Sequence, residues 1–370
     1  MNPLYEIIRR EIGQCGALPF ACFMELALYC PKHGYYETKK DNPGRRGDFY
    51  TSVGVGEVFG QLLASQFAEW LEELRNAERG AGIVEAGAHD GRLTGDILGW
   101  LQANRPELFE QMEYWIIEPS AVRREWQKET LADFAPRVRW LSRFNDSIRL
   151  RFNGVIFSNE LLDAMPVHRF GWDAKNRKWF EWGVTLNGEK YVWAKISAPH
   201  SALCTPQLDL PSTILHLPSS LLESLPDGYT IEVCPAAESW WREAANFVGC
   251  GKLMTIDYGL TADELFSPGR LNGTLRAYHR HQVSSDLLAN VGEQDLTAHV
   301  NFSVIQAAGE SAGLKTESCQ TQAQFLTGIL AKASKNNLLG NWTAAQARQF
   351  QTLTHPEHLG RAFRVLVQSR

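Results

Sequence analysis

The sequence predicts an α/β fold, in which a mostly parallel, twisted sheet carries helices on both of its faces. Three observations lead to this prediction. Short apolar strands alternate with helices from about residue 82 onward. A turn with two glycines joins the first of these strands to its helix, and an aromatic hairpin at 171–199 interrupts the alternation. Since neighbouring parallel strands need a long crossover connection, strict alternation is typical of a parallel sheet covered by helices.

The residues before the sheet are expected to form helices and a loop. Apolar residues predict a helix over 18–29, which Pro31 stops. A turn-rich stretch follows at 39–47, with Asn42-Pro43-Gly44 at its centre. Apolar positions that recur in steps of three and four then predict a long amphipathic helix over 58–74. We expect residues 1–80 to form a helical extension with a covering loop.

The alternation proper begins at residue 83. Its first half comprises strands at 83–84, 115–117, 138–141 and 155–157, with helices at 93–101 and from the N-cap Ser120 to about residue 134. After the hairpin, the expected elements are helices at 236–247 and 304–312, strands at 252–256, 314–319 and 363–367, and a helical stretch at about 322–351. Asn187-Gly188, flanked by aromatic residues, predicts the hairpin turn. The sequence thus predicts an α/β core in two halves, 81–170 and 231–370, separated by a β-rich insertion at 171–230.

Composition and charge exclude several classes of protein. The chain has 370 residues, of which 44% are hydrophobic, so it can bury a large core. Its net charge is -5 and its basic residues are scattered, which disfavours nucleic acid as a partner. No apolar run approaches the roughly 18 residues that span a bilayer, and no signal or transit peptide is recognisable. We therefore expect no membrane span and a cytoplasmic location.

Neither cysteine nor histidine predicts a metal site. The seven cysteines include no Cys-x-x-Cys pair, which disfavours both a disulfide framework and a zinc knuckle. His279 and His281 are closely spaced, as are His355 and His358, but neither pair has an acidic or cysteine partner nearby. Structural or surface roles are favoured for all four.

The turn at 85–91 predicts a nucleoside-binding site. Gly87 lets the chain turn sharply off the strand, and Gly91 lets the start of the helix lie close to a ligand. Three residues separate the glycines, so the Gly-x-Gly-x-x-Gly spacing of a dinucleotide site is missing. Glu85 beside the turn suits a cationic amino-acid cofactor, and Glu118 after the next strand could accept hydrogen bonds from ribose hydroxyls. The alternative is a glycine turn in an α/β protein without a ligand.

A second polar group follows the fourth strand. Ligands of open α/β sheets sit beyond the carboxyl ends of the strands, so Asn159 and Glu160 should face the reactive end of a cofactor. Asp163 lies one turn further on. The carboxylates of Glu160 and Asp163 could bind a guanidinium group through hydrogen bonds and accept a proton from it. Alternatively, Glu160 and Asp163 cap a loop and hold a base such as Arg169.

These segments together resemble the MidA family of methyltransferases. The resemblance is carried, in the order of the family and over nearly the whole chain, by residues 23–29, 33–36, 47–52 with 59–60, 85–93, 159–167, 232–237, 256–259, 273–278 and 295–302. It implies a class I, Rossmann-like methyltransferase fold and S-adenosyl-L-methionine as the cofactor. It also implies a protein acceptor, with an arginine nitrogen methylated where the acceptor is known. Since the family includes an assembly factor of respiratory complex I, a respiratory-complex subunit is one expected partner.

The resemblance also assigns residues. It implies cofactor contacts from Glu85, Gly87, Gly91 and Glu118. Leu93 and Asn159 are further candidate cofactor contacts. It further implies a loop that closes over the methionine end of the cofactor and that includes Gly47, Asp48, Phe49 and Thr51. Glu160, Asp163 and His299 are the candidate catalytic residues, and helix capping or a core role is the alternative for His299.

The sequence departs from the family in two places. Ala88-His89-Asp90 replaces the usual Pro-Gly-Arg, and Val53 replaces the proline that usually follows Thr51-Ser52. His89 is either a plain loop residue or a contact to the cofactor carboxylate.

The leading hypothesis from the glycine turn, the two carboxylates and the family resemblance is protein-arginine methylation. An assembly factor that keeps the fold but has lost catalysis is the alternative, and a nicotinamide oxidoreductase is disfavoured by the glycine spacing.

Overall fold

A large, mostly parallel sheet organises one part of the chain, and smaller antiparallel sheets organise another. The computed structural model describes residues 3–38, 51–74, 81–144, 151–196, 219–267, 269–279, 282–284, 286–335 and 342–370. The chain divides into two units of packed segments. Unit 1 comprises Met1–Lys39, Asp163–Ser239 and Leu260–Val304, and unit 2 comprises Lys40–Leu162, Trp240–Gly259 and Ile305–Arg370. Each unit therefore combines segments that are far apart in the sequence.

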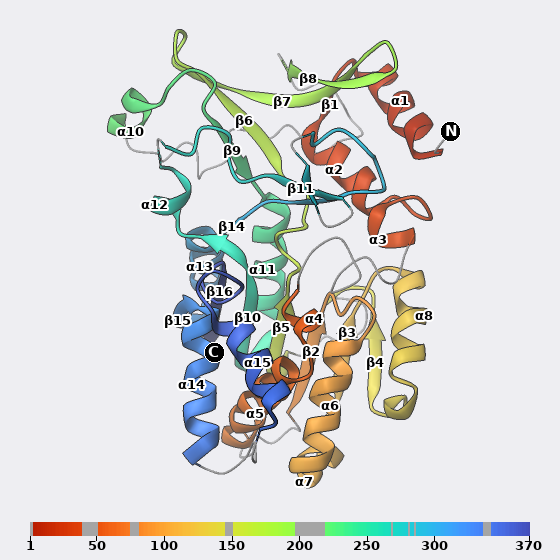
Figure 1. Ribbon diagram of the computed structural model, residues 1–370, viewed down its shortest axis with the longest axis vertical. Coiled ribbons are helices and arrows are strands. Elements are labelled where there is room, and N and C mark those ends of the chain that lie inside the picture. The colour runs from red at the N-terminus through yellow and green to blue at the C-terminus, as the bar shows by residue number, and fades with distance from the viewer. Residues whose placement is uncertain are drawn as a thin grey trace. The chain divides into compact units, whose positions relative to one another are not determined.

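The large sheet lies in unit 2 and has the strand order β15-β16-β10-β5-β2-β3-β4 (Figure 1). Its strands are β2 (Gly82–Ala86), β3 (Tyr114–Ile117), β4 (Val138–Leu141), β5 (Phe152–Asn159), β10 (Val248–Leu260), β15 (Lys315–Thr321) and β16 (Phe363–Ser369). All neighbours from β10 to β4 pair in parallel, whereas β16 is antiparallel to both β10 and β15. The predicted α/β fold with a mostly parallel sheet is confirmed.

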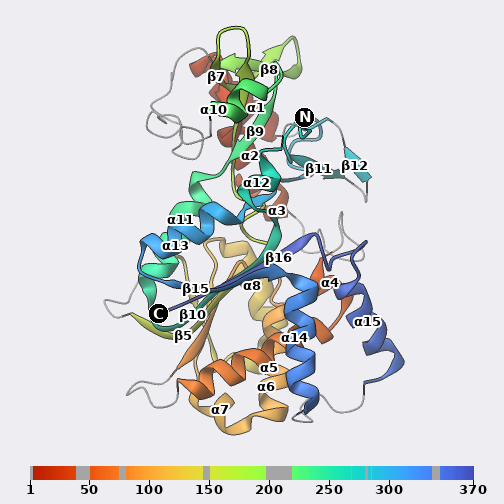
Figure 2. The ribbon, with the colours of Figure 1, turned by 90° about the vertical axis from the view of Figure 1, so that its left-hand side faces the viewer.

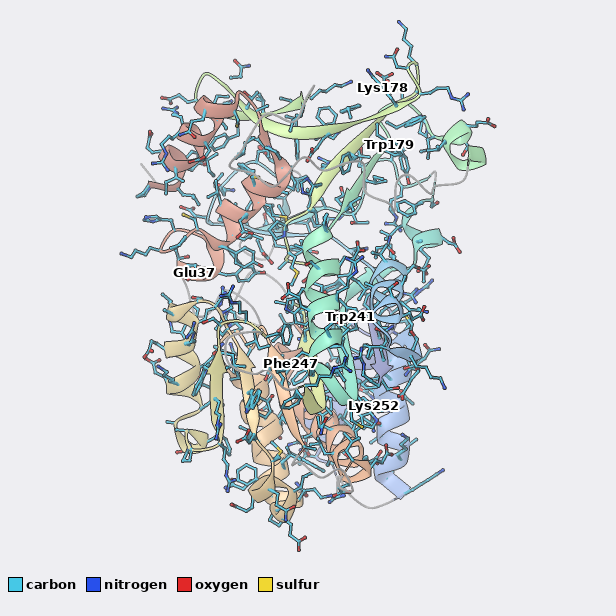
Figure 3. The ribbon with its side chains drawn as sticks, turned by 180° about the vertical axis from the view of Figure 1, so that it is seen from behind. Glu37, Lys178, Trp179, Trp241, Phe247 and Lys252 are labelled. Carbon is cyan, nitrogen blue, oxygen red and sulfur yellow. The ribbon has the colours of Figure 1, made fainter. Side chains whose placement is uncertain are left out.

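Helices cover both faces of this sheet (Figure 2). The helices of this part are α4 (Ser52–Val55), α5 (Val58–Glu73), α6 (Arg92–Asn104), α7 (Pro106–Gln111), α8 (Ala121–Thr130), the 3-10 turn η1 (Ala132–Phe134), α11 (Pro235–Phe247), α13 (Phe302–Ser311), α14 (Gln322–Lys335) and α15 (Ala344–Thr354). On one side, α5 and α6 bury their apolar residues against the strands, and the rings of Phe67 and Phe157 lie 4.9 Å apart. On the other side, Phe247 of α11 stacks on Phe152, and the indole of Trp241 donates to Gln368 of β16 (Figure 3). Both faces are thus buried, as near-continuous apolar strands require.

Unit 1 is built from short helices and two antiparallel sheets. Its elements are α1 (Pro3–Cys15), β1 (Leu18–Pro19), α2 (Phe20–Tyr29), α3 (Tyr35–Thr38), β6 (His168–Asp173), β7 (Lys178–Asn187), β8 (Lys190–Ile196), α10 (Ser219–Ser224), β9 (Thr230–Val233), α12 (Ala262–Leu265), β11 (Arg276–His279), β12 (Gln282–Ser284), β13 (Asp295–Thr297) and β14 (Val300–Asn301). One sheet has the order β1-β7-β6-β9, with β8 paired to β7, and the other has the order β12-β11-β13. Helix α2 contributes Phe20, Phe23 and Met24 to the core between them. The N-terminal helical extension and the hairpin insertion are therefore both present.

Three local predictions need correction. The helix expected over 18–29 begins at Phe20, because Leu18 and Pro19 pair with β7. The stretch expected to be helical at 322–351 contains two helices, α14 and α15, on either side of residues outside the described part. The hairpin turn consists of Gly188 and Glu189, since Asn187 still pairs with Lys190. Of these turn residues only Gly188 has a positive φ, 61°, which is the pattern of a turn that needs glycine at its first central position.

Within the described residues, no helix combines the length and the apolar character that a bilayer crossing needs. The same residues contain no group of three or more His, Cys, Asp or Glu side chains suited to hold a metal ion. Cys30 and Cys250 are free thiols.

Candidate active site

The sheet of unit 2 has one point at which its chain connections change direction. From β2 the chain continues to β3 and β4 on one side, while β5 and β10 lie on the other side. Ligands of open α/β sheets bind beyond the carboxyl ends of the strands at such a point. The turn that starts at Gly87 and the pair Asn159-Glu160 directly follow β2 and β5. The two groups that the sequence singled out are therefore brought to the same edge of the sheet.

The turn between β2 and α6 has an unusual backbone. Gly87, His89 and Gly91 have φ values of 75°, 47° and 87°, so three of five successive residues are left-handed. A Cβ at position 87 would lie 2.8 Å from Cδ1 of Leu161, which follows β5. Both glycines of the turn are retained, although Ala88-His89-Asp90 departs from the family.

Gly91 also meets a constraint within the protein, which the sequence did not predict. A Cβ there would lie 3.3 Å from Leu131 and 3.4 Å from the Cα of Gln127, which belongs to α8. Gly91 therefore allows the left-handed start of α6 and the close approach of α8. Leu93, in the first turn of α6, is buried in the core of unit 2.

Glu85 is a buried carboxyl group on β2. One of its oxygens accepts hydrogen bonds from Oγ1 of Thr94 and from the hydroxyl of Tyr114, both at 2.6 Å. The pKa of Glu85 is raised to about 7. Burial is the largest cause and outweighs the two hydrogen bonds, and the charges of Asp90 and Asp96 act in the same direction as burial. A neighbouring cation would favour the ionised form. The group is thus suited to respond to a positively charged ligand.

Glu118 follows β3 and is also buried. Its Oε1 accepts from the backbone N–H of Ser120 and from Nε of Arg123, each at 2.9 Å, and the guanidinium of Arg123 forms an ion pair with it. Its Oε2 accepts from Nε2 of Gln127 at 3.3 Å. These contacts fix the carboxylate and neutralise its charge. Sequence reasoning missed Arg123, although its position five residues after Glu118 on the following helix was a usable signal.

Gln127 connects the glycine turn to Glu118. Its Nε2 also donates to the carbonyl oxygen of His89 at 3.0 Å, and its Oε1 accepts from the indole of Trp140. The ring of His89 lies 6.0 Å from that of Trp126, the residue before Gln127. Helix α8 thus contacts both His89 and Glu118, two of the residues predicted to bind the cofactor. The sequence contained no local signal for this bridge.

Asp90 stabilises the turn electrostatically. Burial alone would raise its pKa, but the hydrogen bond to His89 and the charge and hydrogen bond of Arg92 lower it to about 2. The shortest of these contacts joins Oδ2 of Asp90 to Nε of Arg92 at 2.6 Å. Asp90 is therefore ionised at neutral pH and belongs to the framework of the turn.

The segment at Thr51 meets Glu160. Thr51 caps α4, and the N–H of Ser52 donates to Oε1 of Glu160 at 3.1 Å, as does Nδ2 of Asn159 at 3.0 Å. The hydroxyl of Ser52 in turn donates to Gln322, which anchors it in the core. Glu160 itself has a φ of 51°, a conformation that costs energy in a residue with a side chain. Of the predicted covering loop, Gly47, Asp48 and Phe49 lie outside the described residues.

Asp257 fixes the turn that carries Glu160. This buried residue of β10 accepts from the N–H groups of Leu161 and Leu162 with Oδ2, at 3.2 and 2.8 Å, and from that of Tyr258 with Oδ1. We did not predict a role for it. An acid directly after the mostly apolar segment 253–256, near the carboxyl end of a strand, was the available signal.

Asp163 and His299, the other two predicted catalytic residues, lie in unit 1. The backbone oxygen of Asp163 accepts from the N–H of Ala298 at 2.9 Å, and its side chain is buried. Burial lowers the pKa of His299 to about 4, and the charges of Arg270 and Arg276 contribute. His299 is therefore neutral at neutral pH. Arg169, the base considered as an alternative partner of Glu160 and Asp163, forms its ion pair with Glu232.

The residues of the glycine turn fit a nucleoside cofactor. Nε2 of His89 and Oδ1 of Asn159 are buried and have no hydrogen-bond partner among the described residues. Such atoms cost about 1–3 kcal/mol each unless a partner is supplied. A ligand with amino and hydroxyl groups supplies partners of this kind.

The strand order, the glycine turn and the acids at the ends of β2 and β3 define a class I methyltransferase. Comparison with known proteins agrees. The model of a family described as S-adenosyl-L-methionine-dependent methyltransferases matches residues 62–320, and the chain belongs to this family. A protein from Burkholderia thailandensis, described as a methyl transferase and crystallised with S-adenosyl-homocysteine, is 32% identical with a TM-score of 0.82, over 100% of this chain and 92% of that one.

Curated relatives are similar over almost the same length. The Drosophila melanogaster protein arginine methyltransferase NDUFAF7 homolog, mitochondrial, is 25% identical over 98% of this chain and 84% of its own. Protein arginine methyltransferase NDUFAF7, mitochondrial, of Mus musculus is 25% identical over 98% of this chain and 83% of its own. The predicted family, fold class, enzyme class and cofactor are therefore confirmed, and the chain is an S-adenosyl-L-methionine-dependent methyltransferase.

The expected cytoplasmic location is wrong. The relatives from fly, mouse and human are named as mitochondrial proteins, which contradicts it. The charge and hydropathy of a folded chain reflect its contact with water, and every aqueous compartment supplies that contact. Composition therefore carries no information on the compartment.

Proposed function

We propose that this enzyme methylates a guanidinium nitrogen of an arginine side chain in a protein acceptor. The observation that carries the proposal is Glu160, a carboxylate held at the carboxyl end of β5 by the N–H of Ser52 and the amide of Asn159. The names of the curated relatives as protein arginine methyltransferases support it. By family resemblance, the acceptor is a subunit of a respiratory complex.

We assign the cofactor contacts to the glycine-turn edge of unit 2. Gly87 and Gly91 shape the turn, with Leu93 packed beneath it, and Glu118 accepts hydrogen bonds from the ribose. Glu85 favours the positively charged amino-acid part, and His89 and Asn159 supply the two buried polar atoms that lack a partner. We also assign the loop that contains Gly47, Asp48, Phe49 and Thr51 to the methionine end. When bound, S-adenosyl-L-methionine supplies an electrophilic methyl group.

The proposed role of Glu160 is to orient the guanidinium group and to remove its proton. A carboxylate accepts two parallel hydrogen bonds from a guanidinium group, which fixes its plane. As the new N–C bond forms, the bond between the methyl group and the sulfonium sulfur would break and leave the neutral thioether. The nitrogen then becomes more acidic, and its proton passes to a carboxylate oxygen of Glu160. We assign Asp163 and His299 to the acceptor side. Neutral His299 can exchange hydrogen bonds there without adding charge.

The direct test is to identify the methylated atom. The purified enzyme is incubated with methyl-labelled cofactor and a lysate of its source organism, and the labelled protein is hydrolysed to amino acids. We expect the label in methylarginine. Label in another amino acid, or only in small molecules, would contradict the proposal. The variant Glu160→Gln serves as the blank, because it keeps the shape of the side chain but cannot take a proton.

A further inference from the structure

Two arginines of unit 1, Arg270 and Arg276 in β11, lie within electrostatic range of His299. Nε of Arg270 and Nδ1 of His299 are buried and have no hydrogen-bond partner in the described part of the chain. The guanidinium of Arg276 donates to the carbonyl oxygen of Leu275, its own neighbour, at 2.9 Å. Both arginines are close enough to His299 to lower its pKa.

Glu232, whose charge acts on Arg276, is already hydrogen-bonded to its own turn. Oε2 of Glu232 accepts from the N–H and the hydroxyl of Thr274, at 2.7 and 3.2 Å, and its Oε1 lies 3.6 Å from Nε of Arg169. Gly273 has a φ of 68°, and a Cβ on it would lie 2.2 Å from Oε1 of Glu232. Since only glycine lets this turn close on the carboxylate, the turn before β11 is built around the Glu232–Arg169 pair.

The same turn positions His299. Oγ1 of Thr274, which donates to Glu232, accepts from the backbone N–H of His299 at 3.0 Å. The imidazole is neutral at neutral pH, because burial lowers its pKa to about 4 and the two arginines add to this effect. It therefore adds a hydrogen-bonding group without a third positive charge.

The charges in this cluster do not balance. Among the described groups whose charges act on Glu232 or His299, the three arginines Arg169, Arg270 and Arg276 are matched by Glu232 alone, and Arg169 already pairs with it. Burial raises the pKa of Tyr229, beside Arg270 and Glu232, and of Tyr278, beside Arg276, Asp163 and Asp295, so neither tyrosine adds a negative charge at neutral pH. A buried guanidinium nitrogen without an acceptor costs free energy that an anionic ligand recovers. The cluster is thus organised to receive an anion.

We propose that Arg270, Arg276 and His299 form a subsite for a carboxylate of the protein acceptor. Guanidinium groups match the plane of a carboxylate and bind it through paired hydrogen bonds. The inference rests on the proposed function, because it takes the acceptor to be a protein. It deepens that function: the enzyme prefers an arginine that has an aspartate or glutamate nearby.

The main experiment compares synthetic peptides with a single arginine in a neutral background. One aspartate is moved through the positions on either side of the arginine, and each peptide has an asparagine twin. We expect at least one aspartate peptide to exceed its twin in kcat/KM by about tenfold or more. Arg270→Gln and, separately, the exposed Arg276→Gln should remove this preference while keeping turnover of the asparagine peptide. Equal kcat/KM values for all twins in the wild-type enzyme would overturn the subsite.

A matched control and a second readout keep the inference separate from arginine methylation. Arg9→Gln, at a partly exposed position of α1, should retain the preference. Should no peptide be methylated, the readout is the melting temperature with N-acetylaspartate N-methylamide and with its asparagine analogue. A rise specific to the aspartate compound in the wild type, absent in Arg270→Gln, supports the subsite even where arginine methylation fails. The same shift in both proteins, or no shift in either, contradicts it.

Discussion

Glu160, the residue that we propose as the proton acceptor, has a left-handed backbone, and both its conformation and the orientation of its carboxylate depend on distant residues. Its φ of 51° is maintained because Asp257, about a hundred residues later, accepts from the next two backbone N–H groups. The N–H of Ser52 orients the carboxylate. Strain of this kind persists only where the surroundings hold it, and it concentrates at active sites.

Replacement of Glu160 tests its role at the residue scale. In Glu160→Gln, we expect kcat for methyl transfer to fall by about 10²–10⁴, because the amide cannot accept the proton. The affinity for the cofactor, measured by calorimetry, should change by no more than a few-fold. Glu73→Gln, an exposed acid in the last turn of α5, is the control. Turnover of Glu160→Gln equal to that of the wild type would contradict the assignment.

Glu85 should make stability depend on pH. Its pKa is raised from 4.5 to about 7 in the folded state, so the folded protein holds this proton more tightly than the unfolded chain. Stability is therefore lost as the pH rises from the unfolded pKa through the folded one. Without cofactor, Glu85→Gln should gain up to roughly 3 kcal/mol relative to the wild type as the pH rises from about 5 to 8.

Denaturant unfolding at several pH values measures this difference. Glu73→Gln should show no such trend, because its side chain is exposed. A gap between wild type and Glu85→Gln that stays constant with pH would show that Glu85 does not titrate in this range. The same variant should bind the cofactor more weakly, so stability and binding are expected to change in opposite directions.

At the scale of elements, α8 connects the glycine turn to the carboxyl end of β3, two segments that we assign to the cofactor site. Gln127 bridges His89 and Glu118, and the close approach of α8 to the glycine turn requires Gly91. Helix α8, the glycine turn and the end of β3 thus form one connected group. A substitution in one of them should therefore alter the conformation of the other two.

Two glycines on one helix provide a matched test. Gly91 starts α6 with a φ of 87° and faces Leu131, whereas nothing lies within 4 Å of a Cβ built on Gly99 in the middle of the same helix. Gly91→Ala should destabilise the protein by about 1 kcal/mol or more and weaken cofactor binding. Gly99→Ala should stabilise it by up to about 1 kcal/mol. Thermal unfolding and calorimetry check both, and similar effects of the two variants would argue against the special role of Gly91.

At the scale of the whole molecule, the described residues assigned to the cofactor lie in unit 2. At about 100 times its dissociation constant, S-adenosyl-homocysteine should stabilise this unit by about 2.7 kcal/mol. Hydrogen exchange should show the largest protection at 85–91 and 117–127. Protection confined to unit 1 would mean that the cofactor binds elsewhere.

Local signals in the sequence determined the order and type of most elements of unit 2, whereas α1, α10, β9 and β11 to β14 of unit 1 were not predicted. Apolar residues at three- and four-residue steps predicted α5, and the glycine turn located the start of α6, because these patterns reflect interactions between near neighbours in the chain. The family resemblance added the cofactor and the enzyme class. These parts needed no knowledge of how distant segments pack.

Only the tertiary structure decided which distant residues meet. The contacts from Ser52 to Glu160, from Asp257 to Leu162 and from Arg123 to Glu118 depend on strand order and on how helices lie against the sheet. It also decided that Gly91 lies close to Gln127 of α8, and that His299 lies within electrostatic range of two arginines. The periodicity of apolar residues predicts which face of an element is buried. It does not predict which side chains that face contacts, because those contacts depend on how distant segments pack in the whole fold.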